Sequence, residues 1–284
     1  MNILITGATG RLGRVLTPEL ARAGHAVRAT SRAPAGGPGT APAGVEPAGS
    51  NPARVDSART DPARIDWVRV DLATGEGLDA AVGDIDTVVH LASAPYQRGY
   101  TRQVDVDGTR RLVEAAGRAG VRHLVYLSIV GADRVPWPYF KAKVEAEAIV
   151  AAGPVPWTVL RVTQFHDLLD EAMTKLARLP VLPVDPQIVG QPVDVRDVAA
   201  HLGWRVTAPP GRATEEFAGP TVIGFAEGLR DWLTVRQVRR PMLRLPVPGR
   251  LGRAFRTGAL TSATGNRGQI SWHDYLADGV GRVV

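Results

Sequence analysis

The chain has 284 residues, 44% of them hydrophobic, a formal net charge of +6 and no cysteine. The absence of cysteine excludes disulfides, zinc–thiolate sites and thiol catalysis. The six histidines have no metal-ligand spacing, so we expect no metal site. Only three of the 34 basic residues are lysines, and we attribute this arginine-rich charge to compositional bias rather than to a nucleic-acid-binding surface.

The sequence carries no sign of a membrane segment. No apolar run approaches the ~20 residues that a membrane span needs. The first predicted strand begins at residue 2, which leaves no room for a signal peptide. We therefore expect a cytoplasmic protein that binds neither a membrane nor a nucleic acid.

Strand and helix patterns alternate along the first part of the chain. A β-rich run at residues 2–6 is followed by a glycine turn, a helical pattern and a second strand at 25–31. Later β-rich runs occur at 67–72, 86–93, 122–128 and 156–162, with helical patterns at 106–120 and 140–153. This alternation predicts βαβ units and an α/β fold, with a Rossmann-type doubly wound parallel sheet.

We divide the chain into two parts. Residues 1–165 are expected to form a dinucleotide-binding domain. Residues 166–284 are expected to form mainly a smaller substrate-binding region over the carboxyl edge of the sheet. The boundary is soft, because a strand or helix can cross back. Residues 33–64 are rich in proline, glycine and alanine, so we predict a flexible surface insertion there.

The glycine turn is the first stretch with a chemical signature. Gly7, Gly10 and Gly13 follow a strand directly and open a helix, a context that indicates dinucleotide binding. Glycines allow a close approach to a pyrophosphate, and the helix N-terminus favours negative charge. We assign cofactor contacts to this turn, including Thr9 and Leu12; a purely structural turn is the alternative.

The end of the second strand distinguishes NADP from NAD. An acidic residue there binds the ribose 2′-hydroxyl of NAD, whereas an arginine suits the 2′-phosphate of NADP. The sequence has Ser31 and Arg32 and no acid, and Arg11 in the glycine turn adds a second cation. We therefore expect NADP(H) as the preferred cofactor, with NAD(H) possible. The alternative is that both arginines are ordinary surface residues.

Two later strand ends complete the expected cofactor site. Asp71 and Leu72 end the third strand, where a carboxylate can accept a hydrogen bond from the adenine amine or cap a turn. Leu91, Ala92 and Ser93 end the fourth strand, where small residues let the backbone run beside the cofactor.

Tyr139 and Lys143 are the strongest candidate for a catalytic pair. Four-residue spacing places both on one helical face, about 5–6 Å apart at Cβ, where an ammonium lowers the pKa of a phenol. With five tyrosines and three lysines in the chain, random placement predicts roughly 0.05 such pairs. The alternative is an ordinary amphipathic helix with Pro138 in its first turn. Ser128 ends the preceding strand, at the edge that faces the ligand crevice in parallel sheets.

Together these motifs resemble the short-chain dehydrogenase/reductase superfamily, in its atypical NmrA-like branch of NAD(P)-binding proteins. The resemblance is carried by TGATGRLG at 6–13, DL at 71–72, HLAS at 90–93, VDVDGTRRLVEAA at 104–116, LSIVG at 127–131, YFKAK at 139–143 and VDVRDVA at 193–199. It covers most of the first 200 residues and only weakly the C-terminal third.

The resemblance implies roles for individual residues. Tyr139 would be the general acid, Lys143 would bind the nicotinamide ribose and lower the tyrosine pKa, and Ser128 would orient the substrate oxygen. Many extended relatives have an asparagine where this chain has Asp105, so the usual relay residue is absent here. Many NmrA-like proteins lack the Tyr–Lys pair and only sense nicotinamide cofactors; the presence of the pair favours an enzyme.

The substrate side carries fewer signals. Trp137 stands just before the Tyr139 helix and could line the site of an aromatic substrate or pack in the core. Gln164, Phe165 and His166 follow a strand end and could reach the crevice, although a structural histidine is the alternative for His166.

These observations predict an NADPH-dependent oxidoreductase that reduces a carbonyl or quinone group of a small, largely apolar or aromatic molecule. The alternative is a non-enzymatic sensor that reports the NADP(H) redox state to a protein partner. An epimerase or dehydratase could use the same cofactor and residues, because fold does not fix the reaction. For the oligomeric state, a homodimer is one option.

Overall fold

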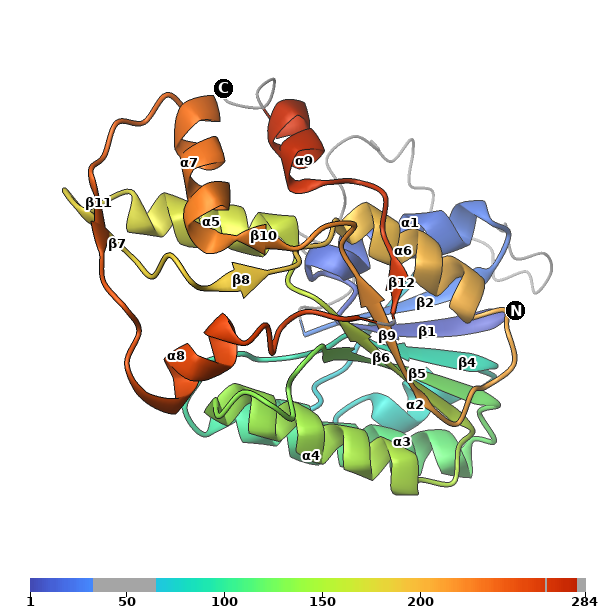
Figure 1. Ribbon diagram of the computed structural model, residues 1–284. Helices are drawn as coiled ribbons and strands as arrows, with labels where there is room; N and C mark the ends of the chain where they lie inside the picture. Colours follow the sequence, from blue (N-terminus) through green and yellow to red (C-terminus); the bar gives the residue numbers. More distant parts are fainter. Residues whose placement is uncertain (33–64, 264, 280–284) are drawn as a thin grey trace.

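The computed structural model describes residues 1–32, 65–263 and 265–279, so the predicted insertion at 33–64 lies outside the described part of the chain. The main sheet consists of β1 (Asn2–Thr6), β2 (Ala26–Ser31), β3 (Asp66–Arg69), β4 (Thr87–His90), β5 (His123–Ile129), β6 (Trp157–Val162), β9 (Thr214–Ala218) and β12 (Asn266–Arg267). Its eight strands lie in the order β12-β9-β6-β5-β4-β1-β2-β3 (Figure 1).

All neighbouring strands of this sheet are parallel. The order from β3 to β6 is that of the Rossmann fold, which confirms the predicted doubly wound α/β architecture. The strand β1 shows how the sequence produces two covered faces. Ile3 and Ile5 pack into the core on one side, and Leu4 packs into the core on the other. Because both faces are buried, the central strands are almost continuously apolar.

Helices cover the two faces of the sheet (Figure 1). On one face lie α1 (Arg11–Arg22) and α6 (Val195–Arg205), and on the other α2 (Leu78–Val82), α3 (Thr109–Arg118) and α4 (Pro138–Ala152). A π-helical segment, η1 (Arg102–Gly108), runs directly into α3. Such segments are rare and occur frequently at functional sites.

The C-terminal half contributes to both the sheet and a smaller region. β9 and β12 pair within the main sheet, and α6 covers one of its faces, so these elements cross back over the soft boundary near residue 165. The remaining elements are α5 (His166–Leu176), β7 (Leu182–Val184), β8 (Val189–Gly190), β10 (Ile223–Gly224), α7 (Phe225–Val235), β11 (Met242–Arg244), α8 (Gly249–Arg256) and α9 (Trp272–Gly279). They lie beyond the carboxyl ends of the sheet strands (Figure 1).

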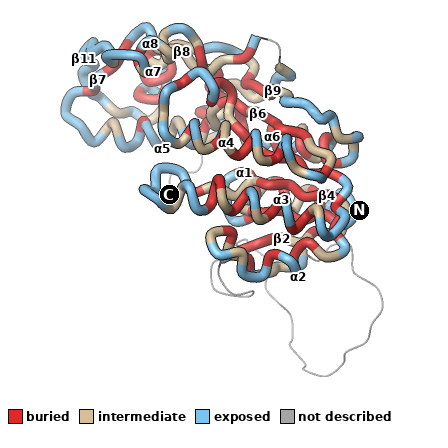
Figure 2. Tube along the Cα trace, turned by 90° about the horizontal axis from the view of Figure 1, so that it is seen from below, coloured by how far each residue is buried: buried red, intermediate tan, exposed pale blue. Residues whose placement is uncertain are grey.

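The smaller region has a core of its own, which includes Met173, Leu182, Leu229, Trp232 and Trp272. Figure 2 shows the contrast between the buried strands of the sheet and the exposed outer elements, among them β11. Within the described residues, no helix has the length and apolarity needed to cross a membrane.

Candidate active site

The glycine turn after β1 is packed against the end of β4. Gly7 has φ +72°, and a Cβ atom there would lie 2.6 Å from the backbone nitrogen of Ala92. A Cβ at Gly13 would lie 2.4 Å from the carbonyl oxygen of Gly7. Gly10 is the N-cap of α1, and its amide donates to the Gly7 carbonyl at 2.9 Å. The three predicted glycines therefore allow strand, turn and helix to approach more closely than side chains permit.

A cavity of about 300 Å³ opens between this turn and the carboxyl ends of β2, β3 and β4. Most of the predicted cofactor residues line it, namely Gly7, Thr9, Gly10, Ser31, Arg32, Asp71, Leu72, Leu91, Ala92 and Ser93. The sequence did not single out the other lining residues, which are Thr30, Val70, Ala94, Gln97, Tyr100 and Val104. This arrangement suits the extended shape of a dinucleotide, with its pyrophosphate at the start of α1.

The two predicted arginines differ in their surroundings. Arg32 lines the cavity, and its Nη1 donates to the Tyr100 hydroxyl at 3.0 Å. Arg11 does not line the cavity; its guanidinium pairs with Asp167, at 2.9 Å, and with Glu171, both on α5. Arg32 therefore lies nearer the cavity than Arg11, whose charge is paired with the two acids of α5.

Leu12 and Gly13 also lie outside the cavity lining. The Leu12 side chain is 4% exposed and packs in the core between the sheet and α1. These two positions therefore support the turn from the side of the core. The Leu12 side chain does not line the cavity.

Tyr139 is hydrogen-bonded to Ser93, a residue that the sequence assigned to the cofactor site. Its hydroxyl lies 2.9 Å from Ser93 Oγ, and Ser93 Oγ donates to Asp105 Oδ1 at 2.5 Å. A serine has one hydroxyl hydrogen, so the phenol is the donor in its bond to Ser93. The second carboxylate oxygen of Asp105 accepts from the Ala94 amide at 2.9 Å. This chain of hydrogen bonds links α4, the end of β4 and the π-helical segment.

Ser128 is buried and apart from this chain. Its side chain is 1% exposed, and its Oγ has no hydrogen-bond partner among the described residues. The structure brings Ser93, rather than Ser128, to the Tyr139 phenol. A signal for this existed in the HLAS motif, but the sequence assigned Ser93 only to cofactor contact.

Burial controls the ionisation of the Tyr–Lys pair. It raises the pKa of Tyr139 above the ordinary value; the hydrogen bond with Ser93 opposes this change, and Asp105 adds to it. The phenol therefore keeps its proton at neutral pH, contrary to the expectation of a lowered tyrosine pKa. Lys143 Nζ donates to the Leu127 carbonyl at 2.7 Å.

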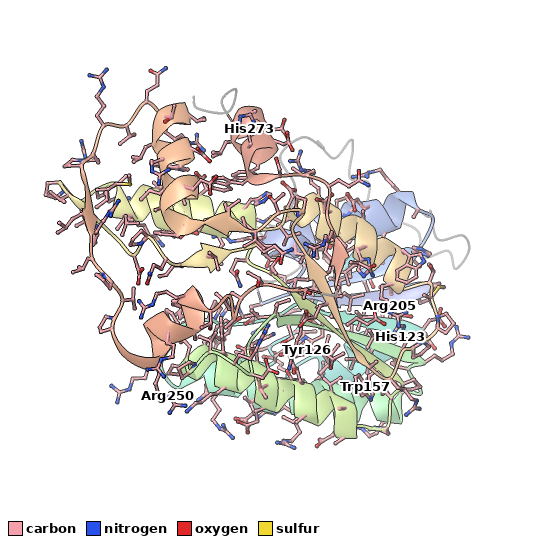
Figure 3. All side chains as sticks on the ribbon, viewed as in Figure 1. His123, Tyr126, Trp157, Arg205, Arg250 and His273 are labelled. Atoms are coloured by element: carbon pink, nitrogen blue, oxygen red, sulfur yellow. The ribbon has the colours of Figure 1, made fainter. Side chains whose placement is uncertain are left out.

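Lys143 itself lies in an enclosed position. Its Nζ is 4.3 Å from the centroid of the Tyr126 ring, which lies between the sheet and α4 (Figure 3). Burial lowers the Lys143 pKa to about 8, with Asp105 and Glu147 opposing that change. An ammonium with this pKa is still charged at neutral pH and can become neutral in mild alkali.

His90 belongs to the framework of the site. Its Nδ1 lies 2.6 Å from Thr6 Oγ1 and its Nε2 lies 2.9 Å from Thr109 Oγ1. Thr109 Oγ1 in turn donates to the Asp105 carbonyl at 2.6 Å. Burial, with a smaller effect of Lys143, lowers the His90 pKa to about 3, so the imidazole is neutral and holds the neighbouring strand ends and the start of α3 in register.

An aromatic cluster covers Tyr139. The Tyr96 ring centroid lies 5.4 Å from that of Tyr139 and 6.0 Å from that of Trp137. Trp137 also contacts Phe255 of α8, with centroids 6.3 Å apart. Tyr96 has a positive φ of 62° and is 65% exposed. A non-glycine residue in this conformation is uncommon, and sequence patterns gave no indication of it.

The three predicted substrate residues after β6 have mainly structural contacts. His166 is 1% exposed; its Nε2 lies 3.1 Å from the Pro192 carbonyl and its Nδ1 lies 3.5 Å from Asp194. The aromatic rings of α9 pack on it. His166 is therefore the structural histidine of the two predicted alternatives.

Gln164 and Phe165 bind the same neighbouring segment. The Gln164 carbonyl accepts from the Val193 amide at 2.9 Å, and the Phe165 side chain packs against the core beside α1 and α6. Gln164 Nε2 is buried without a partner among the described residues. No group of side chains suited to a metal ion occurs in the part of the chain that the structure describes.

Comparison with known proteins agrees with this geometry. A family model described as NAD(P)H-binding matches residues 7–202. The photosystem II assembly factor Ycf39 of Trieres chinensis is 27% identical over 203 residues, which cover 70% of this chain and 57% of that protein. The uncharacterized sugar epimerase YhfK of Bacillus subtilis is 32% identical over 94 residues, covering 30% of this chain and 44% of that protein. The chain thus spans about half the length of these curated relatives.

Solved structures share the fold over nearly the whole chain. The NADPH-dependent quinone oxidoreductase QOR2 of Escherichia coli, complexed with NADPH, has a TM-score of 0.73 at 16% identity, covering 97% of this chain and 99% of QOR2. A short-chain dehydrogenase/reductase superfamily protein of Agrobacterium tumefaciens with bound NAD has a TM-score of 0.72 at 20% identity, covering 99% and 96%. The turn, the cavity and the match over residues 7–202 lead to one conclusion: the chain belongs to the NAD(P)H-binding family.

Proposed function

We propose that the protein is an NADPH-dependent oxidoreductase that reduces a carbonyl or quinone group of a small, largely apolar or aromatic molecule. The observation that carries the proposal is the position of the Tyr139 phenol. It is hydrogen-bonded to Ser93, and Ser93 lines the cofactor cavity. A proton donor thus stands at the end of the cleft in which the nicotinamide would lie.

Tyr139, Ser93 and Lys143 each have a separate role in the proposed reaction. NADPH, when bound along the cavity, would supply the hydride for the carbonyl carbon. Tyr139 gives its proton to the carbonyl oxygen, a role that suits a phenol whose pKa burial raises. Ser93 is held by Asp105 and fixes the phenol oxygen in place. Lys143 would donate to the nicotinamide ribose, which requires its Nζ to exchange the Leu127 carbonyl for the ribose hydroxyls.

The apolar substrate class follows from the aromatic cluster. Tyr96 and Trp137 lie next to the Tyr139 ring and would form the wall of a substrate site. Aromatic rings favour flat, apolar ligands by offset or edge-to-face contact. QOR2, whose fold this chain shares, is itself described as an NADPH-dependent quinone oxidoreductase, which supports testing quinones first.

A preference for NADPH over NADH rests on Arg32. It is the arginine of the second strand end that lines the cavity, and the strand end carries no acid that would repel a 2′-phosphate. A guanidinium binds phosphate oxygens through two parallel donors, which a hydroxyl cannot match.

The second candidate function is a sensor that binds NADP(H) and reports its redox state to a protein partner. One observation favours it: the Lys143 ammonium is hydrogen-bonded to a backbone carbonyl rather than presented to the cleft. A relative described as an assembly factor fits the same idea. This function predicts redox-selective nucleotide binding with no turnover.

The test is to follow NADPH absorbance with the purified protein and a panel of quinones, ketones and aldehydes, with NADH as the control cofactor. Tyr139→Phe is measured alongside, together with its NADPH affinity. Turnover that prefers NADPH and is lost in Tyr139→Phe, while NADPH still binds, supports the oxidoreductase. Unchanged turnover in Tyr139→Phe removes the phenol from the mechanism. NADPH binding without consumption by any acceptor favours the sensor, and isomerisation of a nucleotide sugar without net NADPH consumption would identify an epimerase.

A further inference from the structure

The ribbon of β7 and β11 is anchored to the core by β7 alone, because all three residues of β11 are exposed. The strands are parallel, with Leu182 opposite Met242, Pro183 opposite Leu243 and Val184 opposite Arg244. Leu182 and Val184 are buried in the core of the smaller region. Successive strand residues point to opposite faces, so Pro183 lies on the outer side of β7, opposite Leu243 of β11.

This outer side is apolar. Pro183 and Leu243 are paired across the two strands, the exposed Val181 and Leu245 lie one residue outside β7 and β11, and we call these four residues the ribbon face. Leu243 is 56% exposed, Leu245 54% and Val181 42%. The exposed Leu179 adjoins the face. Single exposed leucines are ordinary, but a contiguous group of them on one sheet face indicates a contact surface.

Exposed arginines lie on the segments that flank the ribbon face, and the acid that follows β7, Asp185, is buried and paired with Arg256. The exposed arginines of the flanking segments are Arg178, Arg239, Arg240, Arg244, Arg250 and Arg253. None of these six forms an ion pair with another described residue. Residues 177–184 and 238–253 contain no aspartate or glutamate, so Arg178, Arg239, Arg240 and Arg244 have no acid in their own segments, whereas Arg250 and Arg253 line a cavity with Asp133 and Glu145. Arg250 lies on α8, on the side that faces α4 rather than β11 (Figures 1 and 3).

Three kinds of partner can be compared with this surface. A second copy of the chain docked face to face would bring Arg239, Arg240 and Arg244 of each copy against those of the other. A nucleic acid would use the charge but not the leucines, because residues 177–184 and 238–253 offer no aromatic ring for base stacking. The headgroup region of an anionic bilayer uses both, since it attracts arginine and accepts apolar side chains at its boundary.

We propose that the ribbon face docks the protein on an anionic lipid surface. The contact is peripheral, so it does not need the spanning segment whose absence led to the expectation of no membrane partner. Backbone pairing with β7 and the prolines at 241, 246 and 248 hold the leucines in place before contact. Little ordering is therefore required on binding. The proposal does not depend on the proposed reductase activity.

The experiment is flotation of the full chain with vesicles of phosphatidylcholine and phosphatidylglycerol at about 2:1, compared with phosphatidylcholine alone. We expect binding to the anionic vesicles only, decreasing with salt. Leu243→Gln/Leu245→Gln should lower the partition coefficient roughly tenfold or more, because two partly exposed leucines lose their apolar contact. Arg239→Gln/Arg240→Gln should lower it by a similar factor.

Matched controls separate this face from general charge and hydrophobicity. Arg22→Gln/Arg110→Gln removes the same charge from α1 and α3, and Trp204→Gln removes a side chain that is 58% exposed on α6. Both should bind vesicles as the wild type does, within roughly twofold. NADPH affinity should be unchanged in every variant, which also reports that each has folded.

Four results would overturn the proposal. The first two are no binding to the anionic vesicles and unaltered binding in the double-leucine variant. The other two are conversion of a dimer to a monomer by that variant, and arginine-dependent binding to single-stranded DNA but not to the vesicles.

Discussion

The hydroxyl oxygens of Tyr139 and Ser93 lie 2.9 Å apart, and they join the helix α4 to the end of β4. Because Ser93 donates its hydroxyl hydrogen to Asp105, the hydroxyl hydrogen of Tyr139 points toward Ser93 in this arrangement. A substrate oxygen that takes the phenol proton must therefore compete with Ser93 for it. The pair sets both the position and the direction of the proposed proton donor.

The first prediction compares the two serines. Ser93→Ala should lower kcat for carbonyl or quinone reduction roughly 10- to 100-fold, since the phenol loses the group that positions it. Ser128→Ala should change kcat by less than about threefold, because its hydroxyl is buried and unpartnered among the described residues. Steady-state kinetics with NADPH affinity measured in parallel provides the comparison. A large loss in Ser128→Ala with none in Ser93→Ala would restore the role that the family resemblance implied for Ser128.

The second prediction concerns cofactor choice. Arg32→Ala should weaken NADPH binding roughly 10- to 100-fold while leaving NADH binding nearly unchanged, because only the 2′-phosphate loses a charged partner. Arg11→Ala is the matched control: its guanidinium is already paired with Asp167 and Glu171, so both affinities should stay within about threefold. Fluorescence titration of the two nucleotides measures this. Equal losses of NADH and NADPH affinity in Arg32→Ala would mean that the arginine stabilises the shape of the cavity and does not bind the 2′-phosphate.

The third prediction separates backbone conformation from close contact. Gly7 and Gly24 both have positive φ, at +72° and +85°, but a Cβ at Gly24 would meet nothing within 4 Å. Gly24→Ala should lower the free energy of unfolding by about 1–2 kcal/mol through backbone strain alone. Gly7→Ala adds a clash with Ala92 and should cost about 2–5 kcal/mol in all.

Urea unfolding of both glycine variants, with an NADPH titration of each, tests this difference. Gly7→Ala should also lose most of its NADPH affinity, whereas Gly24→Ala should keep it. If both variants lose the same stability and neither loses affinity, the contact between the turn and the end of β4 has no role in cofactor binding.

Most residues that line the cavity could be predicted from the sequence, because a general rule relates the ends of parallel strands to ligand sites. Carboxyl ends of parallel strands meet at one edge of the sheet, so the sequence alone was enough to group Ser31, Asp71 and Ala92, which line one cavity. The glycine turn is equally local, since its conformation depends on residues within one short stretch.

The details that depended on distant packing could not be predicted. Ser128 shares a strand face with Tyr126, and a shift of one position along β5 would have turned it to the other side of the sheet. Arg11 is neutralised by α5, more than 150 residues later in the chain. His166 is enclosed by Trp272 and Tyr275 of α9. No local pattern contains these partners, so spacing alone left the roles of these residues open.

The last prediction uses the pKa of Lys143, which burial lowers to about 8. If its ammonium donates to the nicotinamide ribose, NADPH affinity should decrease as pH rises above about 8, by at most tenfold per pH unit. Lys143→Met should bind NADPH weakly with no such dependence. Lys141→Met removes the exposed lysine two positions earlier on α4 and should behave as the wild type.

Stability should respond to pH with the opposite sign. Between about 8 and the ordinary lysine value of 10.5, Lys143 is neutral in the folded state and charged in the unfolded state. The unfolded state then binds more protons, so the free energy of unfolding rises with pH over this range and the rise is absent in Lys143→Met. Urea unfolding at a series of pH values, compared with NADPH titrations at the same values, measures both slopes. If NADPH affinity and the free energy of unfolding both fall above pH 8, a general destabilisation of the protein in alkali, and not deprotonation of Lys143, causes the loss of NADPH binding.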